Sequence, residues 1–184
     1  DFARRLAGEA LNRFGRVDVL VNNASILGPS PLPPLRDYPL TELEQVIAVN
    51  VLAPLCLAQL VLPGMLARGN GLIVNISSDA AVGGYPGWGG YGASKAALDL
   101  LTHTLANELA GTGVGAVAID PGDMRTEMHQ AAFPGEDISD RPLPEEVVPA
   151  ILGIIERELA RTRDADSGDE AGAARPWRYQ PQGE

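Results

Sequence analysis

Three short runs of mainly Val, Ile and Leu recur along this 184-residue chain, and each is followed by a longer segment with helical spacing of apolar residues. Strands buried on both faces of a parallel sheet read as such continuous apolar runs, and the intervening helices cover the two faces. We therefore predict an α/β fold, a doubly wound parallel sheet in three α/β/α layers. The expected strands are 17–21, 71–76 and 114–119, and the expected helices are 2–14, 41–67, 93–110 and 145–160.

Local signals set the boundaries between these elements. Thr41 and Glu44 form a capping-box pattern at the start of the second helix, and five prolines in 29–39 predict a loop before it. A glycine-rich loop is expected over 77–92. It contains a literal G-x-G-x-x-G at 87–92, which we reject as a dinucleotide fingerprint because it does not follow its strand directly. Charge, Gly and Ala dominate from Arg161, so we predict one domain portion over 1–160 and a flexible tail over 161–184.

Charge and cysteine content exclude several classes of function. The chain carries 14 Lys and Arg against 24 Asp and Glu, a net charge of −10, which argues against nucleic acid or an anionic membrane as partner. One cysteine cannot form an internal disulfide, no zinc-ligand spacing occurs, and no signal peptide is visible, so we expect no metal and a cytoplasmic location. Pro, Gly, Asn and Gln interrupt the apolar stretch 47–66, which favours a buried helix over a membrane span.

Polar residues follow all three predicted strands, at 22–25, 77–78 and 121–126. Ligands of parallel α/β sheets bind outside the carboxyl ends of the strands. These three segments are therefore expected at one edge of the sheet, although each could also be only a polar strand end or a turn.

Tyr91 and Lys95 lie four residues apart, which places both side chains on one helix face. Lys95 is the only lysine among 14 cationic residues, so the position favours a compact ammonium over a general surface charge. An ammonium beside a phenol lowers the pKa of the phenol and prepares it for general acid–base catalysis. Ser78 could donate a hydrogen bond to an oxygen that gains negative charge. The alternative is a surface lysine beside a core tyrosine.

The ordered segments Asn22-Asn23-Ala24-Ser25, Val49-Asn50-Val51, Ile76-Ser77-Ser78, Tyr91-Gly92-Ala93-Ser94-Lys95 and 121–126 resemble the motifs of the short-chain dehydrogenase/reductases. The resemblance covers about residues 1–126 and implies a Rossmann-like sheet. It implies that Tyr91 is the general acid/base, that Lys95 lowers the pKa of Tyr91 and binds the nicotinamide ribose, and that Ser78 positions the substrate oxygen. It also implies that Asn50 holds a proton-relaying water, although a buried Asn can equally be hydrogen-bonded locally.

The same resemblance implies NAD or NADP as cofactor and a carbonyl or alcohol as substrate. Asn23, Ala24 and Ser25 would pass near the adenosine ribose, and Pro121, Gly122 and Thr126 would contact the nicotinamide side. Ser25 stands where the family usually has Gly, a departure expected to leave catalysis alone and to alter the cofactor contact.

The family's glycine-rich phosphate loop has no match in this sequence, and the last strand has only a weak one at 177–179. The chain is then expected to hold mainly the second half of the sheet, with its first strand at an exposed edge. The alternative function is a truncated or degenerate domain that binds no dinucleotide and acts through protein contacts.

Two further expectations concern apolar side chains. Met124, Met128 and Phe133 would cover an apolar or amphipathic substrate, or else simply pack. Leucines on the two long helices exceed the need of one sheet face and predict a homo-oligomer. These leucines are Leu55, Leu57, Leu60, Leu62, Leu98, Leu101, Leu105 and Leu109.

Overall fold

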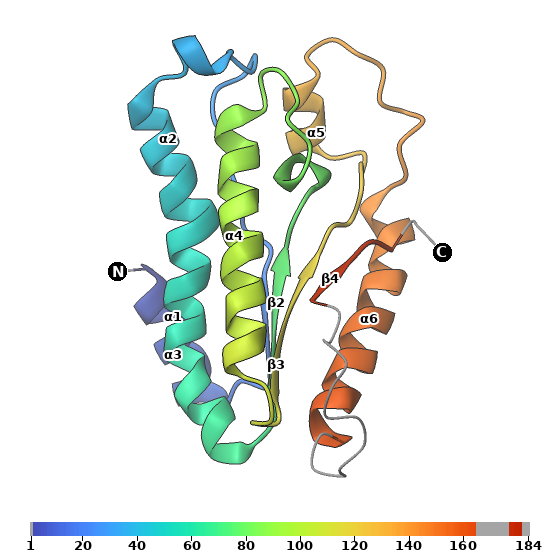
Figure 1. The fold of residues 1–184 in the computed structure, drawn as a ribbon. Coiled ribbons are helices and arrows are strands. Elements are labelled where there is room, and N and C mark those ends of the chain that lie inside the picture. The colour runs from blue at the N-terminus through green and yellow to red at the C-terminus, as the bar shows by residue number, and fades with distance from the viewer. Residues whose placement is uncertain (1, 165–176, 182–184) are drawn as a thin grey trace.

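The computed structural model describes residues 2–164 and 177–181 and confirms an α/β fold with a parallel sheet (Figure 1). The strands are β1 (Val19–Asn22), β2 (Gly71–Ile76), β3 (Val114–Ile119) and β4 (Arg178–Tyr179). The helices are α1 (Phe2–Phe14), α2 (Leu40–Ile47), α3 (Ala53–Arg68), α4 (Gly89–Glu108), α5 (Glu127–Ala132) and α6 (Pro144–Asp164). Short helical turns are η1 (Leu35–Asp37), the π-helical η2 (Ala48–Leu52) and η3 (Asp79–Ala81).

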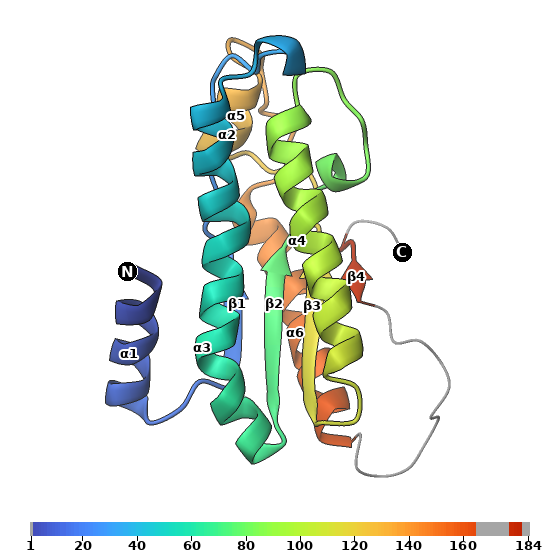
Figure 2. The same cartoon turned by 60° about the vertical axis from the view of Figure 1, so that its left-hand side comes forward.

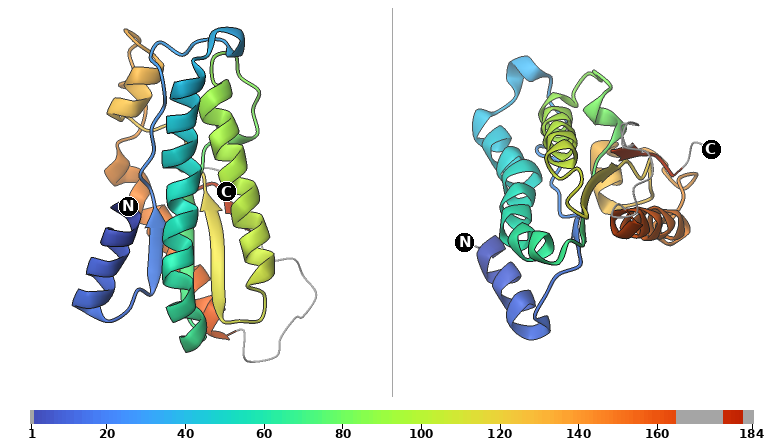
Figure 3. Two further views of the ribbon diagram at one scale, coloured as in Figure 1. Left: turned by 90° about the vertical axis from the view of Figure 1, so that its left-hand side faces the viewer. Right: turned by 60° about the horizontal axis from the view of Figure 1, so that its bottom comes forward.

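The four strands run in the order β1-β2-β3-β4, all parallel, with β1 at one edge. Helices α3 and α4 cover one face and α6 covers the other, which gives the three expected layers (Figures 1 and 2). Figure 3 shows α1 beside α3 at the β1 side of the sheet. On β1, Val21 is 46% exposed, as expected for an edge strand.

Alternate residues of the central strands β2 and β3 pack into two hydrophobic cores, one on each face of the sheet. On the α3/α4 side, Ile73 and Ala116 pack with Met65. On the other side, Leu72 and Val117 pack with Ile154 of α6. This alternation with a period of two explains why both strands read as unbroken apolar runs.

Several predicted boundaries were wrong. The helix predicted from Thr41 begins at Leu40 after Pro39, with no side-chain cap, so the capping box does not form. The first strand is shifted to Val19–Asn22, and α6 continues to Asp164, four residues beyond the predicted helix end at residue 160. The short strand suggested at 177–179 is present as β4, whereas residues 165–176 and 182–184 lie outside the described residues.

Helix α4 begins at Gly89, four residues before the predicted start, because its first turn packs tightly on neighbouring loops. A Cβ atom at Gly90 would collide with the Tyr38 ring, and one at Gly92 would lie 2.6 Å from the Ala80 carbonyl oxygen. Packing within the chain therefore requires glycine at both positions.

One continuous helical stretch of the described chain, Leu40–Arg68, has the length and composition to cross a membrane. Only 33% of its most apolar window is buried, less than the predicted buried helix implies. A single stretch of this kind is weak evidence, since core helices of soluble proteins have the same character. Leu98 and Leu109, which we expected on an oligomer surface, are buried in the chain's own core.

Candidate active site

The carboxyl ends of β1, β2 and β3 meet at one edge of the sheet, and a cavity of about 400 Å³ opens there. The sequence prediction that three distant polar segments converge is confirmed. Of the predicted site residues, all but Asn50 line this cavity. They are Asn23, Ala24, Ser25, Ser78, Tyr91, Lys95, Pro121, Gly122 and Thr126.

A buried chain of hydrogen bonds fixes α4 on the sheet. The Asn22 amide donates to Asn75 Oδ1 at 2.7 Å, and Asn75 Nδ2 donates to Thr102 Oγ1 at 2.7 Å. The Thr102 hydroxyl donates in turn to the Leu98 carbonyl at 2.7 Å. These contacts join β1, β2 and α4, so they fix the register in which α4 presents Tyr91 to the cavity.

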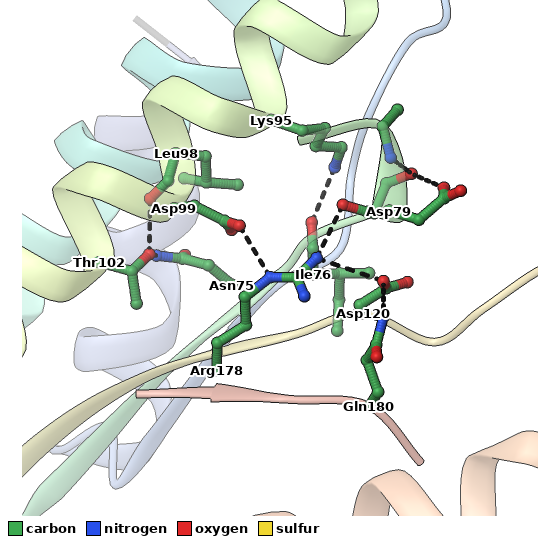
Figure 4. Close-up of polar contacts among 12 residues, drawn as sticks. Asn75, Ile76, Asp79, Lys95, Leu98, Asp99, Thr102, Asp120, Arg178 and Gln180 are labelled. Atoms are coloured by element: carbon green, nitrogen blue, oxygen red, sulfur yellow. Dashed lines mark hydrogen bonds and ion pairs between the residues drawn. The ribbon is translucent and has the colours of Figure 1, made fainter. Parts of the chain in front are cut away.

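Lys95 is 2% exposed, and its Nζ donates to the Ile76 carbonyl oxygen at 2.7 Å (Figure 4). Burial lowers the pKa of Lys95 to about 8, while the carboxylates of Asp99 and Asp120 act in the opposite direction. The ammonium lies 5.5 Å from the centre of the Tyr91 ring, so the two side chains share the predicted helix face.

The predicted lowering of the pKa of the Tyr91 phenol is wrong. Tyr91 is 8% exposed, and burial raises the pKa of its phenol to about 12. The Ser25 and Ser78 hydroxyls lower this pKa by hydrogen bonding, but less than burial raises it. Loss of solvation of the phenolate therefore outweighs the neighbouring polar groups.

Ser78 ends the loop that follows β2 and caps η3 by accepting from the Ala80 N–H at 3.2 Å. Its hydroxyl donates to Asp79 Oδ1 at 3.1 Å. The Ser78 proton therefore already points to an anionic oxygen within the cavity. A ligand oxygen that accepts this hydrogen bond has to replace Asp79.

Ser25 lies closer to Tyr91 than its sequence position predicted. Its Oγ is buried without a hydrogen bond of good geometry to any described residue, yet it faces the Tyr91 hydroxyl and lowers the pKa of that group. The departure from the usual Gly therefore affects the tyrosine and not only a cofactor contact.

The segment after β3 forms the outer wall of the cavity. Gly122 has a φ of 73°, which suits glycine, and its N–H donates to Asp120 Oδ1 at 3.0 Å. Thr126 caps α5 by accepting from the His129 N–H at 3.1 Å. Met128 of α5 lines the cavity and also packs against the buried cluster that contains Tyr91, so its covering role stays a prediction.

Asn50 does not reach the cavity. It lies in the π-helical turn η2 and is 1% exposed. Its Oδ1 accepts from the Ile26 N–H at 2.9 Å, and its Nδ2 donates to the Ile26 carbonyl at 2.9 Å and to Ser94 Oγ at 3.0 Å. The side chain thus holds the loop after β1 against α4, which is the local hydrogen bonding that the sequence left open.

Comparison with known proteins agrees with this geometry. A family model described as short chain dehydrogenase matches residues 1–137. The chain belongs to the short chain dehydrogenase family. It is 39% identical over 133 residues to 2-(R)-hydroxypropyl-CoM dehydrogenase from Xanthobacter autotrophicus, with 72% of this chain and 53% of the relative covered. It is 37% identical over 128 residues to the 3-oxoacyl-[acyl-carrier-protein] reductase FabG from Thermotoga maritima, with 70% and 51% covered.

Solved structures extend the match beyond the family motif region. A short chain dehydrogenase from Shigella flexneri complexed with NADP superposes with a TM-score of 0.77 at 28% identity, covering 98% of this chain and 70% of that one. The chain spans about half the length of the curated relatives it matches. The match to the family model and to these relatives does not favour the alternative of a degenerate domain.

Sequence reasoning missed several residues that line this short chain dehydrogenase cavity. Asp79, Trp88 and His129 line it, and Asp120 sits at the end of β3. Asp120 carried a usable signal, because it follows a strand directly at the carboxyl edge. Trp88 did not, since its edge-on contact with Tyr91, with ring centres 5.9 Å apart, depends on the early start of α4.

Proposed function

We propose that the full-length protein is an NAD(P)-dependent oxidoreductase that interconverts a carbonyl and an alcohol, with Tyr91 as general acid/base. The observation that carries this proposal is the convergence of Tyr91, Lys95 and Ser78 on one cavity at the carboxyl edge of the sheet. Relatives support it, because FabG from Thermotoga maritima is a reductase by name and the Shigella short chain dehydrogenase was solved with NADP. NAD and NADP stay equal candidates.

The chain's own residues fit the nicotinamide end of such a cofactor. The Ser25 Oγ is a buried hydroxyl without a partner of good geometry among the described residues, and it lies at the cavity beside Tyr91. Asn23, Ala24 and Ser25 would hold one side of the cofactor, and Pro121, Gly122 and Thr126 would hold the other. When bound, the nicotinamide supplies or accepts the hydride.

The proton side of the reaction follows from the site's electrostatics. With a pKa of about 12, Tyr91 stays protonated at neutral pH and can donate to a carbonyl oxygen as that oxygen gains charge. Ser78 donates a second hydrogen bond to the same oxygen once that oxygen replaces Asp79 as its acceptor. Lys95, with a pKa of about 8, is a cation near neutrality and favours negative charge nearby.

The test compares Tyr91→Phe with Tyr85→Phe in the full-length protein. Tyr85 is 48% exposed and makes a matched control. Oxidation of NADH or NADPH is followed with a panel of ketones. Tyr91→Phe should lose about 10²–10⁴-fold in turnover, the usual contribution of a general acid, and Tyr85→Phe should retain turnover.

Cofactor binding is read separately from the fluorescence of Trp88, which lines the cavity. Tyr91→Phe should still quench with the reduced nucleotide. Unchanged turnover in Tyr91→Phe refutes the role of the tyrosine. Quenching with neither NADH nor NADPH in the wild type supports the alternative, a domain that acts through protein contacts.

We further propose a homo-oligomer through the outer surfaces of α3 and α4. Leu66 of α3 and Leu100 of α4 are 43% and 67% exposed, and Leu52, directly before α3, is 56% exposed. A contact between subunits would remove this apolar surface from water. Light scattering tests this, and a monomer contradicts it. The predicted cytoplasmic location stays a prediction.

A further inference from the structure

Arg178, from the short C-terminal strand β4, reaches under the cavity and binds three elements at once (Figure 4). Its Nε donates to Asp99 Oδ2 at 3.0 Å, and its Nη2 donates to Asp120 Oδ2 at 3.2 Å. The same Nη2 donates to the Ser78 carbonyl at 2.9 Å. Gln180 adds a bond to Asp120 Oδ2 at 2.7 Å. One guanidinium therefore ties β4 to α4, to the end of β3 and to the loop after β2.

Each of these contacts touches the neighbourhood of the proposed chemistry. Asp99 lies one helical turn after Lys95 on α4, and both Asp99 and Asp120 act on the charge of the Lys95 ammonium. The Ser78 carbonyl belongs to the residue whose hydroxyl faces Tyr91. Arg178 thus holds the backbone of Ser78 while it neutralises the carboxylates beside the lysine.

We propose that Arg178 is a positioning residue of the cavity, which fixes the Ser78 loop and balances Asp99 and Asp120 beside Lys95. The inference rests on the proposed function for its catalytic meaning, but its physical content is a charge coupling that exists without turnover. It makes the C-terminal strand a part of the site, although Arg178 lies far along the chain from the other members.

The groups that face Lys95 come from several elements. Asp99 lies on α4, Asp120 at the end of β3, and Tyr91 on α4 itself. Among these groups, Asp99 depends most on Arg178 as a hydrogen-bond partner, because its Oδ1 is buried without a hydrogen bond to any described residue. Removing the guanidinium leaves Asp99 as an uncompensated buried charge, which acts more strongly on the nearby ammonium.

Strand β4 has anchors that do not involve Arg178. The Trp177 ring stacks on His103 with ring centres 4.7 Å apart, and the Tyr179 hydroxyl donates to Glu158 Oε1 at 2.7 Å. Substitution of Arg178 therefore removes the charge and the Ser78 contact while these anchors keep the strand in place. Tyr179→Phe is a matched control that loosens the strand from α6 and leaves the guanidinium intact.

Lys95 is the only lysine in the sequence, so ε-¹³C-lysine labelling gives one NMR signal whose titration reports its pKa directly. In Arg178→Gln the pKa of Lys95 should rise by about 0.5–1, as loss of a nearby positive charge requires. Asp99→Asn alone should lower it. The double variant Arg178→Gln with Asp99→Asn should return the pKa of Lys95 close to the wild-type value. Arg178→Lys keeps the positive charge, so the pKa of Lys95 should stay close to the wild-type value there too.

The double variant distinguishes charge coupling between Arg178 and Lys95 from a general loosening of the cavity. If Arg178 were only structural, opening of the cavity would raise the pKa of Lys95 toward 10.5 in Arg178→Gln and equally in the double variant, and Tyr179→Phe would do the same. That pattern, or an unchanged pKa in Arg178→Gln, overturns the proposal.

These titrations need neither cofactor nor substrate, so their outcome is independent of the Tyr91→Phe assay. In the full-length enzyme, the pH profile of Arg178→Gln should shift upward together with the Lys95 titration. A profile that stays in place while the NMR titration moves overturns the link to the site.

Discussion

The buried ammonium of Lys95 makes a testable contribution to stability. Its pKa is about 8 in the folded chain against 10.5 for the ordinary side chain. Below pH 8 the folded state therefore contains a buried charged lysine, which lowers the free energy of unfolding. At about 1.4 kcal/mol per pH unit, this difference costs about 3 kcal/mol of folding free energy near pH 7. Lys95→Met removes that cost but also loses the 2.7 Å hydrogen bond to the Ile76 carbonyl, worth about 1 kcal/mol or more. Lys95→Met should therefore be about 1–2 kcal/mol more stable than wild type at pH 7.

The pH dependence has a definite sign. Between pH 8 and about 10 the unfolded chain keeps the lysine proton that the folded chain has released, so the unfolded state binds more protons and wild-type stability rises with pH. The advantage of Lys95→Met should therefore shrink as pH rises through this window. Urea unfolding at several pH values from 7 to 10 measures it, with Tyr91→Phe as the control that keeps the lysine. A pH-independent difference between Lys95→Met and wild type would refute the argument.

Three other predictions concern packing and the departure at Ser25. Asn50→Ala should lower the free energy of unfolding by at least about 2 kcal/mol, because buried backbone groups lose their hydrogen-bond partner. An unchanged urea midpoint would contradict this role. Gly92→Ala should cost about 1–3 kcal/mol, since its Cβ would meet the carbonyl of η3 at 2.6 Å, whereas Gly8→Ala, with open space around it, should not destabilise. Ser25→Gly should raise the pKa of Tyr91, read by ultraviolet titration of tyrosinate, and a lowered pKa would show that the serine does not stabilise the phenolate.

The sheet and the meeting of the site segments could be predicted because their signals are local. Strands β2 and β3 have the bounds expected from apolar runs that begin after glycine-rich turns and end in polar residues. The rule that ligands bind at carboxyl ends then brought Ser78 and Pro121 to one cavity. Neither inference needed knowledge of side-chain packing.

The remaining features depend on contacts between distant residues. Glycine propensity placed 89–92 in a loop, but packing against Tyr38 and Ala80 makes this the first turn of α4. The pKa of Tyr91 followed burial, which spacing on one helix cannot reveal. Arg178 meets Asp99 79 residues away, and no local pattern joins them.

The buried charges of the site balance, and this balance explains how a protonated lysine persists at 2% exposure. Lys95 and Arg178 supply two positive charges, and Asp99 and Asp120 supply two negative charges, with the Arg178 side chain only 19% exposed. A buried ion is tolerated when paired and hydrogen-bonded, whereas an unpaired one shifts its pKa until it is neutral. The Tyr-x₃-Lys spacing by itself would place an isolated ammonium in a desolvated cavity, where its pKa would fall further. Charge-balancing carboxylates, themselves held by Arg178, keep that pKa near 8, so the lysine can stay cationic at neutral pH beside the tyrosine.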